Sequence, residues 1–255
     1  DMIDHRDAMQ ATELPPGHGP TAVFETSGTT GAAISVTSTS LMSLASNGLR
    51  WRCHVWNDLD WTRTLCIRDG SDPERGKPPR GTPAGPWGPS WDVIAQTGRS
   101  RVINKLASGE ETLDFLKDHD CAYLNTGPKT VHTYALDAIR LDRKVRLEAV
   151  LCQGSTIDDA DHQIARDVFG ARLIEHYSSR EAGQMAHICG SDHLHINGEC
   201  VLVEVVGDDG LPVPEGTVGH TVVTPFFNTA QPLIRYDQGD MAIAGGRCEC
   251  GRMLP

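Results

Sequence analysis

The sequence has little of what a membrane protein or a general nucleic-acid binder needs. Aromatic residues make up 5% of the 255 residues, and no apolar run is long enough to span a bilayer. Lysine and arginine number 23 against 34 aspartates and glutamates, which gives a net charge of −11. We therefore expect neither nucleic acid nor a membrane as a partner. A phosphate ligand remains compatible with this charge, because backbone N–H groups can hold phosphate with few cations.

The apolar core of a secretory signal is also missing, since the first seven residues are mostly charged. Eight cysteines in a chain of this length, without a signal, argue against a disulfide framework and predict a cytoplasmic protein. Cys53, Cys66, Cys121 and Cys152 stand singly in apolar segments, which is typical of small buried side chains. The chain does not begin with Met, so we expect it to be a piece of a longer protein.

The first two-thirds of the chain alternate between strand and helix signals. We predict strands at 22–25, 64–67, 121–125, 147–151 and 171–175, and helices at 41–56, 110–117, 129–140 and 157–169. Strands separated by helices imply a parallel sheet that binds ligands beyond the carboxyl ends of its strands. Residues 69–91 contain six prolines and five glycines, so no regular element is expected there.

After residue 181 the pattern changes to short strands, predicted at 200–206, 219–224 and 241–244, with a hairpin turn at 207–210. The predicted fold class is α/β: a mostly parallel sheet with flanking helices, followed by a smaller β-rich subdomain. We place the α/β nucleotide-binding subdomain at 1–185 and the β-rich subdomain at 186–255.

Three segments carry candidate chemistry. Thr26-Ser27-Gly28-Thr29-Thr30-Gly31 follows a predicted strand, and its glycines and hydroxyls suit a loop around phosphate, although it lacks the ending of a Walker loop. Glu175–Gly183 comes at the carboxyl end of a predicted parallel strand. Pro232–Asp240 is an apolar strand that ends in a turn with two aspartates. Taken singly, each segment could also be an ordinary polar turn.

Taken together and in this order, the three segments resemble the adenylate-forming (ANL) superfamily, most closely its phenylacetate–CoA ligase branch. The family's Ser-Ser-Gly-Thr-Thr-Gly corresponds to Thr26–Gly31, and its Tyr-Gly-x-Thr-Glu to Tyr177–Glu181. Its Pro-Leu-Ile-Arg-Tyr-x-Thr-Gly-Asp corresponds to Pro232–Asp240. The Cys-x-Cys-Gly-Arg at Cys248–Arg252 is also typical of this branch.

The resemblance implies roles for particular residues. Thr26, Ser27, Gly28, Thr29, Thr30 and Gly31 would contact the β,γ-phosphates of ATP, with Gly154 and Ser155 beside the adenine. Tyr177 would stack on the base, and Asp240 would accept the ribose hydroxyls. Glu181 would hold Mg²⁺, and Arg235 could neutralise phosphate charge.

The implied activity is that of an ATP-dependent acid–thiol ligase: a small carboxylic acid is converted to an acyl-adenylate and then transferred to a thiol, with CoA as the expected acceptor. A homodimer is compatible with this interpretation. The alternative is a catalytically silent nucleotide-binding or structural module. Arg180 favours it by replacing the family's Thr, although its guanidinium could still reach the α-phosphate. The chain also stops before the family's mobile C-terminal domain and its adenylation lysine, so we expect this chain alone to be poorly active.

A structural Zn²⁺ site is predicted separately. Cys248 and Cys250 form a short knuckle that can supply two thiolates, and Cys189 with His195 is the expected second pair. His193 and Cys200 are competing ligands. The alternative is a set of reduced thiols without a metal.

Overall fold

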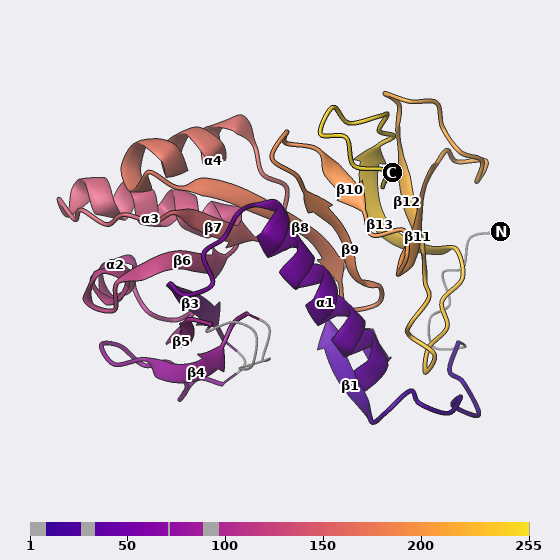
Figure 1. The fold of residues 1–255 in the computed structure, drawn as a ribbon, viewed down its shortest axis with the longest axis horizontal. Helices are drawn as coiled ribbons and strands as arrows, with labels where there is room; N and C mark the ends of the chain where they lie inside the picture. Colours follow the sequence, from indigo (N-terminus) through magenta and orange to yellow (C-terminus); the bar gives the residue numbers. More distant parts are fainter. Residues whose placement is uncertain (1–8, 27–33, 71, 89–96, 255) are drawn as a thin grey trace. The chain divides into compact units, whose positions relative to one another are not determined.

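The computed structural model describes residues 9–26, 34–70, 72–88 and 97–254, and the chain divides into two compact units (Figure 1). The central unit comprises Asn57–His176. The discontinuous unit comprises Asp1–Trp56 together with Tyr177–Pro255. This division differs from the predicted boundary at residues 185 and 186, because the N-terminal segment folds with the C-terminal third of the chain.

The central unit is built on the predicted parallel sheet. Strands β3 (Thr64–Asp69), β5 (Arg99–Asn104), β6 (Cys121–Thr126), β7 (Ala149–Cys152) and β8 (Arg172–Ser179) pair in parallel, in the order β8-β7-β6-β3-β5. Strand β4 (Thr82–Pro86) pairs antiparallel with β5 at the edge. The prediction that 69–91 holds no regular element was therefore wrong. An edge strand tolerates Pro83 and Pro86 because it needs a hydrogen-bonded partner on only one side.

Three helices of the central unit accompany this sheet. They are α2 (Gly109–Asp118), α3 (Pro128–Arg140) and α4 (Asp159–Ile164), which continues into a π-helical turn at Ala165–Phe169. Ser108 caps α2 and Asp158 caps α4, each in a reciprocal capping box. Leu113, Phe115 and Leu116 of α2 lie in the buried core. No helix among the described residues has the length and apolar character needed to cross a membrane.

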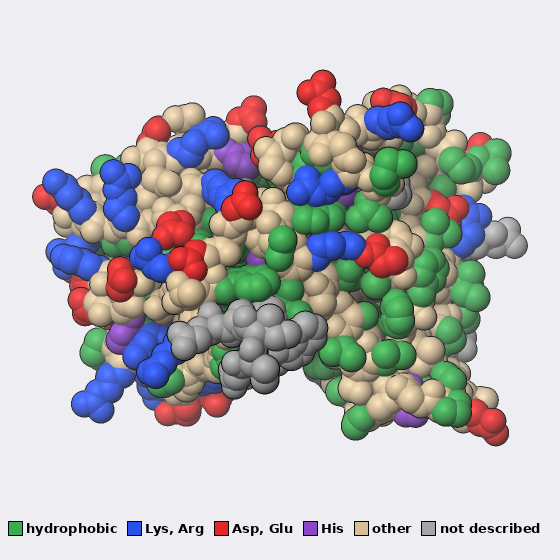
Figure 2. Space-filling model, viewed as in Figure 1, with side chains coloured by type: hydrophobic (Ala, Val, Ile, Leu, Met, Phe, Trp, Pro, Cys, Tyr) green, Lys and Arg blue, Asp and Glu red, His purple; other side chains and the backbone are tan. Residues whose placement is uncertain are grey.

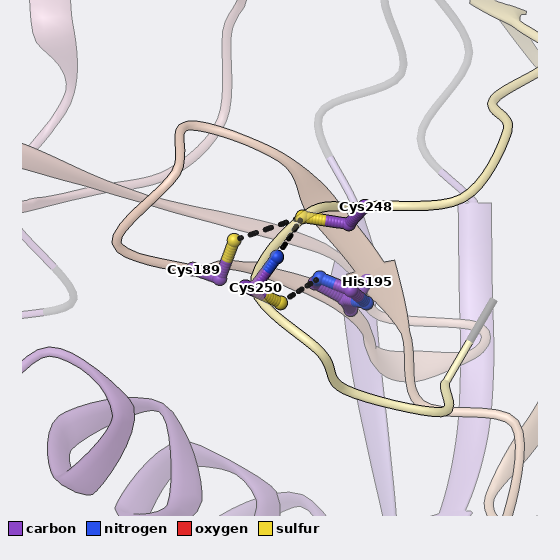
Figure 3. Close-up of side chains that lie close together, drawn as sticks. All are labelled: Cys189, His195, Cys248 and Cys250. Carbon is purple, nitrogen blue, oxygen red and sulfur yellow. Dashed lines mark hydrogen bonds between the residues drawn. The ribbon is translucent and has the colours of Figure 1, made fainter.

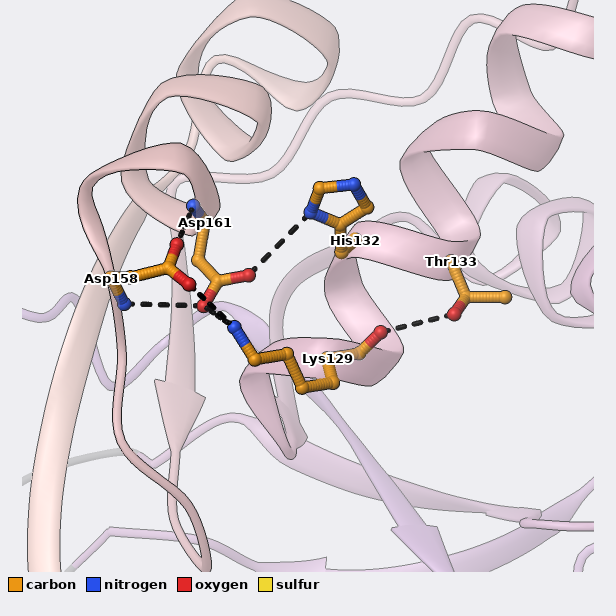
Figure 4. A network of polar contacts seen from close by, with 5 residues as sticks. All are labelled: Lys129, His132, Thr133, Asp158 and Asp161. Atoms are coloured by element: carbon orange, nitrogen blue, oxygen red, sulfur yellow. Dashed lines mark hydrogen bonds and ion pairs between the residues drawn. The ribbon is translucent and has the colours of Figure 1, made fainter.

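Helices α3 and α4 are joined by a polar cluster (Figure 4). The ammonium of Lys129 lies 2.8 Å from Asp158 Oδ2 and 2.7 Å from Asp161 Oδ2. Asp161 is buried, and its Oδ1 lies 3.5 Å from His132 Nδ1. The same two carboxylates also form the capping box of α4, so one cluster both starts that helix and ties it to α3.

The discontinuous unit is mostly β-structure. Strands β1 (Thr21–Thr26) and β2 (Ile34–Thr39) form an antiparallel hairpin, and α1 (Ser40–Trp56) follows. Strands β9 (Gly183–Ile188) and β10 (Leu194–Ile196) pair antiparallel. A separate antiparallel sheet contains β11 (Val201–Val206), β12 (Val218–Pro225) and β13 (Tyr236–Ile243). Within residues 177–254 the structure shows no helix, as the sequence predicts.

Candidate functional site

A β-bulge in β13 shapes the third predicted motif. Val222 pairs with Asp237 and His220 pairs with Met241, so residues 238–240 lie opposite Thr221 alone. Gly239 has a φ of 77°, and its N–H donates to Asp237 Oδ1 at 2.8 Å. A bulge changes the direction of neighbouring side chains without ending the strand. Asp237 is therefore engaged in the local turn, while Asp240 is directed elsewhere.

Asp240 meets Tyr177, the aromatic residue of the second motif. The Tyr177 hydroxyl donates to Asp240 Oδ2 at 3.0 Å, and the Gln238 amide donates to the same hydroxyl oxygen at 3.2 Å. Burial and the adjacent Asp240 carboxylate raise the pKa of Tyr177 well above its ordinary value. The phenol therefore stays protonated, and it acts as a donor to the carboxylate.

The turn between β8 and β9 carries Arg180 and Glu181. Ser179 Oγ accepts a hydrogen bond from the Ala182 N–H at 3.0 Å, which holds this turn. The Arg180 guanidinium lies 5.3 Å from the ring centroid of Phe24, a cation–π contact. Phe24 lies in β1, two residues before the end of that strand, so Arg180 contacts the strand that leads into the first motif. Glu181 is half-buried.

Three other groups of predicted residues are placed as follows. Thr26 is the last residue of β1, and Ser27, Gly28, Thr29, Thr30 and Gly31 lie outside the described residues. Gly154 and Ser155 lie in the exposed segment after β7, in the central unit. Their predicted contacts with a nucleotide stay predictions.

Arg235 has partners of its own. Its guanidinium lies 3.2 Å from Glu204 Oε2 on β11 and donates to the Gly210 carbonyl at 2.8 Å. Its backbone has a φ of 51°, and its N–H donates to Thr224 Oγ1. These contacts account for the guanidinium in the absence of a nucleotide, and its role in neutralising phosphate stays a prediction.

Tyr177 lines a cavity of about 650 Å³ within the discontinuous unit. Its walls are mainly apolar, and a volume of this size is typical of small-molecule pockets. One wall is the C-terminal segment, which includes Cys248 and Arg252. The candidate nucleotide residue Tyr177 and Cys248 of the cysteine knuckle therefore line one cavity.

The predicted metal ligands converge (Figure 3). The donor atoms of Cys189, His195, Cys248 and Cys250 all lie within 4.8 Å of one another. Cys189 Sγ is 3.7 Å from Cys248 Sγ, and Cys250 Sγ is 3.2 Å from His195 Nε2. A tetrahedral zinc with Zn–S bonds of about 2.3 Å places its sulfur ligands about 3.8 Å apart. The three thiols and one imidazole therefore fit a closed Zn²⁺ site.

The surroundings of these four residues also suit a metal. His195 Nδ1 lies 3.0 Å from the Leu254 carbonyl, which favours the tautomer that leaves Nε2 available as a ligand. A hydrogen bond from the backbone N–H of Arg252 contributes most to lowering the pKa of Cys250 to about 6, which favours the thiolate. The two competing ligands, His193 and Cys200, are both described by the structure, and both lie outside this cluster.

Two contributors were not predicted from the sequence. Gln238 touches Tyr177, and Trp56 at the end of α1 packs its ring edge-on to His195, with centroids 5.9 Å apart. Arg252 also lies over Trp56, at 4.6 Å from the ring centroid. A signal for Gln238 was present, because this chain has Gln where the resembled motif has Thr. No local pattern marks Trp56, since its contact joins residues 139 positions apart.

Comparison with known proteins supports the resemblance. No family model matches the chain. A phenylacetate–coenzyme A ligase from Thermus thermophilus is 45% identical over 60 residues, which are 23% of this chain and 14% of that protein.

Solved structures match over more of the chain. A 2-hydroxyisobutyryl-CoA ligase, solved with 2-HIB-AMP and CoA, has a TM-score of 0.72 at 17% identity, covering 95% of this chain and 56% of its own. An acyl-CoA synthetase from Brucella canis has a TM-score of 0.60 at 16% identity, covering 88% of this chain and 43% of its own. The chain thus spans about half the length of these two structures. The structural similarity confirms the predicted mixed α/β fold class.

Proposed function

Because the chain has the fold of the adenylate-forming superfamily, we propose that it contributes to ATP-dependent activation of a small carboxylic acid. The carboxylate would attack the α-phosphorus of ATP, giving an acyl-adenylate and pyrophosphate. The thiol of CoA would then take the acyl group, with AMP as the leaving group. The local identity with a phenylacetate–coenzyme A ligase makes arylacetic acids the first substrates to test.

The observation that carries this proposal is the meeting of Tyr177 and Asp240. These residues are 63 positions apart in sequence, and each belongs to a different motif. The bulge in β13 separates Asp240 from Asp237, which is held in the local turn. An aromatic ring that lines a cavity of about 650 Å³ and bonds to a carboxylate suits a purine and its ribose.

Glu181 and Arg180 would act on the phosphates. A carboxylate oxygen is the ligand that Mg²⁺ prefers, and Mg²⁺ would neutralise phosphate charge when bound. Glu181 lies one residue after Arg180, whose guanidinium contacts the strand leading into the predicted phosphate loop. We therefore assign Glu181 to the metal and Arg180 to the phosphates. Preorganised charge of this kind is a main source of stabilisation in phosphate chemistry.

The Cys/His cluster would hold a structural Zn²⁺. Four protein ligands leave no position for a substrate or a water molecule, so the ion would stabilise the fold rather than activate water. In this role it would fix the C-terminal segment to β9 and β10, where Cys189 and His195 are placed.

A binding titration and an activity assay test the function separately. Calorimetry should detect AMP binding to the 255-residue chain, and a pyrophosphate-release screen of the full-length protein with aryl and aliphatic acids should show which acid is activated. Absence of both would contradict the proposal. AMP binding without turnover for any acid would favour the alternative, a nucleotide-binding module that is catalytically silent.

A further inference from the structure

We infer that Gln238 is a positioning residue: it directs the hydroxyl proton of Tyr177 onto Asp240 and so presets the carboxylate for the ribose. The inference rests on the proposed nucleotide function. It gives a role to a residue of the third motif for which the resemblance implied none, and this role acts through Tyr177 rather than through the ligand.

The direction of the hydrogen bonds carries the first step. A glutamine amide nitrogen can only donate, and Gln238 Nε2 lies 3.2 Å from Tyr177 Oη. The tyrosine oxygen is then an acceptor on that side, so its own proton turns to the other neighbour. That neighbour is Asp240 Oδ2, at 3.0 Å. The result is a one-way chain from the amide through the phenol to the carboxylate.

The amide is held in this orientation by a second contact. Gln238 Nε2 also lies 3.2 Å from the sulfur of Met185, which is completely buried in the core beneath β13. Both contacts engage the nitrogen end of the amide. The bulge that places residues 238–240 opposite Thr221 brings Gln238 and Asp240 to the same phenol.

The oxygen end of the amide shows that Gln238 is poorly suited to a purely structural role. Its Oε1 is buried and has no hydrogen-bond partner among the described residues. An unpaired buried acceptor destabilises a fold, whereas an apolar side chain of similar length would pack there without that cost. A residue kept only for packing would thus be better replaced by methionine.

The chemistry also distinguishes Gln238 from the threonine of the resembled motif. A threonine hydroxyl can both donate and accept, so it leaves the direction of the tyrosine proton open. The glutamine amide nitrogen fixes that direction. We expect Gln238→Thr to bind AMP more weakly than the natural chain but more strongly than Gln238→Met.

The experiment combines Gln238→Met, Tyr177→Phe and the double variant, with Gln184→Met as the matched control. Gln184 is a buried residue of the same discontinuous unit, and its side chain bonds to His187 rather than to Tyr177. Calorimetry with AMP measures affinity, thermal melting measures stability, and the ¹³Cζ resonance of Tyr177, assigned with Tyr177→Phe, reports its hydrogen bonds without any ligand.

We expect Gln238→Met to move the Tyr177 resonance, to weaken AMP binding about fivefold, and to leave the melting temperature unchanged or higher. In the Tyr177→Phe background the same substitution should change affinity less than twofold, because the hydroxyl through which it acts is gone. Gln184→Met should leave both the resonance and the AMP affinity unchanged.

The inference would be overturned if the Tyr177 resonance did not move in Gln238→Met. It would also be overturned if Gln238→Met weakened AMP binding as much in the Tyr177→Phe background as in the natural chain. A third outcome separates the inference from the proposed function. If the Tyr177 resonance moves in Gln238→Met but neither the natural chain nor any variant binds AMP, the hydrogen-bond chain is supported and the proposed nucleotide function is contradicted.

Discussion

The central unit and the discontinuous unit use their polar residues differently. In the central unit, Lys129, Asp158 and Asp161 cap and join helices. In the discontinuous unit, Gln238 and Asp240 of a β-bulge both bond to Tyr177, which lines a cavity. The surfaces differ as well. Of the 16 large hydrophobic side chains that are exposed in the described part of the chain, 13 belong to the discontinuous unit, and Figure 2 shows charged side chains over the helices of the central unit.

This contrast teaches where function concentrates in the molecule. The central unit follows regular periodicities, since strands and helices alternate and each helix buries one face. The discontinuous unit departs from them at a bulge, at a turn and at a cysteine knuckle. Departures from local regularity are expected at functional sites.

The largest expected effect concerns the cysteine knuckle. Cys248→Ser should abolish zinc binding and destabilise the discontinuous unit by about 4 kcal/mol, a size associated with the loss of a structural metal. Metal analysis and thermal melting measure both effects. Cys200→Ser is the matched control, because Cys200 lies in the same unit outside the cluster. Equal zinc content in the two variants would contradict the site.

The parts of the fold that follow from hydrophobic periodicity were predictable. The helix expected at 41–56 is α1 (Ser40–Trp56), and the strand expected at 121–125 is β6 (Cys121–Thr126). Strands β9 and β10 were not predicted, because polar residues such as Gln184, His187 and His195 interrupt their apolar pattern while lying buried. Their partners come from distant segments, which no local pattern reveals.

The candidate site was predictable in its residues but not in its geometry. The motifs predict that Tyr177 and Asp240 serve one ligand. They do not reveal the bulge, because its two extra residues are defined only against β12. The Cys/His cluster was predictable in composition, and the fold supplies the reason for choosing His195, whose Nδ1 is fixed by the Leu254 carbonyl.

A smaller effect is expected in the central unit. Asp161→Ala removes both the capping box of α4 and a buried partner of Lys129, and should destabilise the chain by about 2 kcal/mol. Denaturant unfolding measures this loss. Asp159→Ala, an exposed change in the same helical turn, is the control and should cost less than about 0.5 kcal/mol. AMP binding should be retained in both variants. Its loss in Asp161→Ala alone would contradict the assignment of nucleotide binding to the discontinuous unit.

The smallest effect is expected from the pair of Lys129 with Asp158, because both side chains of this pair are exposed. The hydrogen bond from Lys129 lowers the pKa of Asp158 below the ordinary value of 3.8, so the stability from this pair is present above that pH and is lost as the pH falls through the lowered pKa. The melting difference between the natural chain and Lys129→Met should thus shrink below pH 3.8. A difference that stays constant down to pH 2 would show that the contact is not ionic.

The central claim, that the motifs of the discontinuous unit bind a nucleotide through Asp240, is tested most directly by titrating AMP into two aspartate variants. Asp240→Ala should weaken binding by about 2–3 kcal/mol, because it removes the carboxylate that accepts the ribose hydroxyls. Asp237→Ala should have a clearly smaller effect, since Asp237 bonds to the Gly239 N–H within the turn. Equal losses at the two positions, or binding that Asp240→Ala leaves intact, would contradict the account.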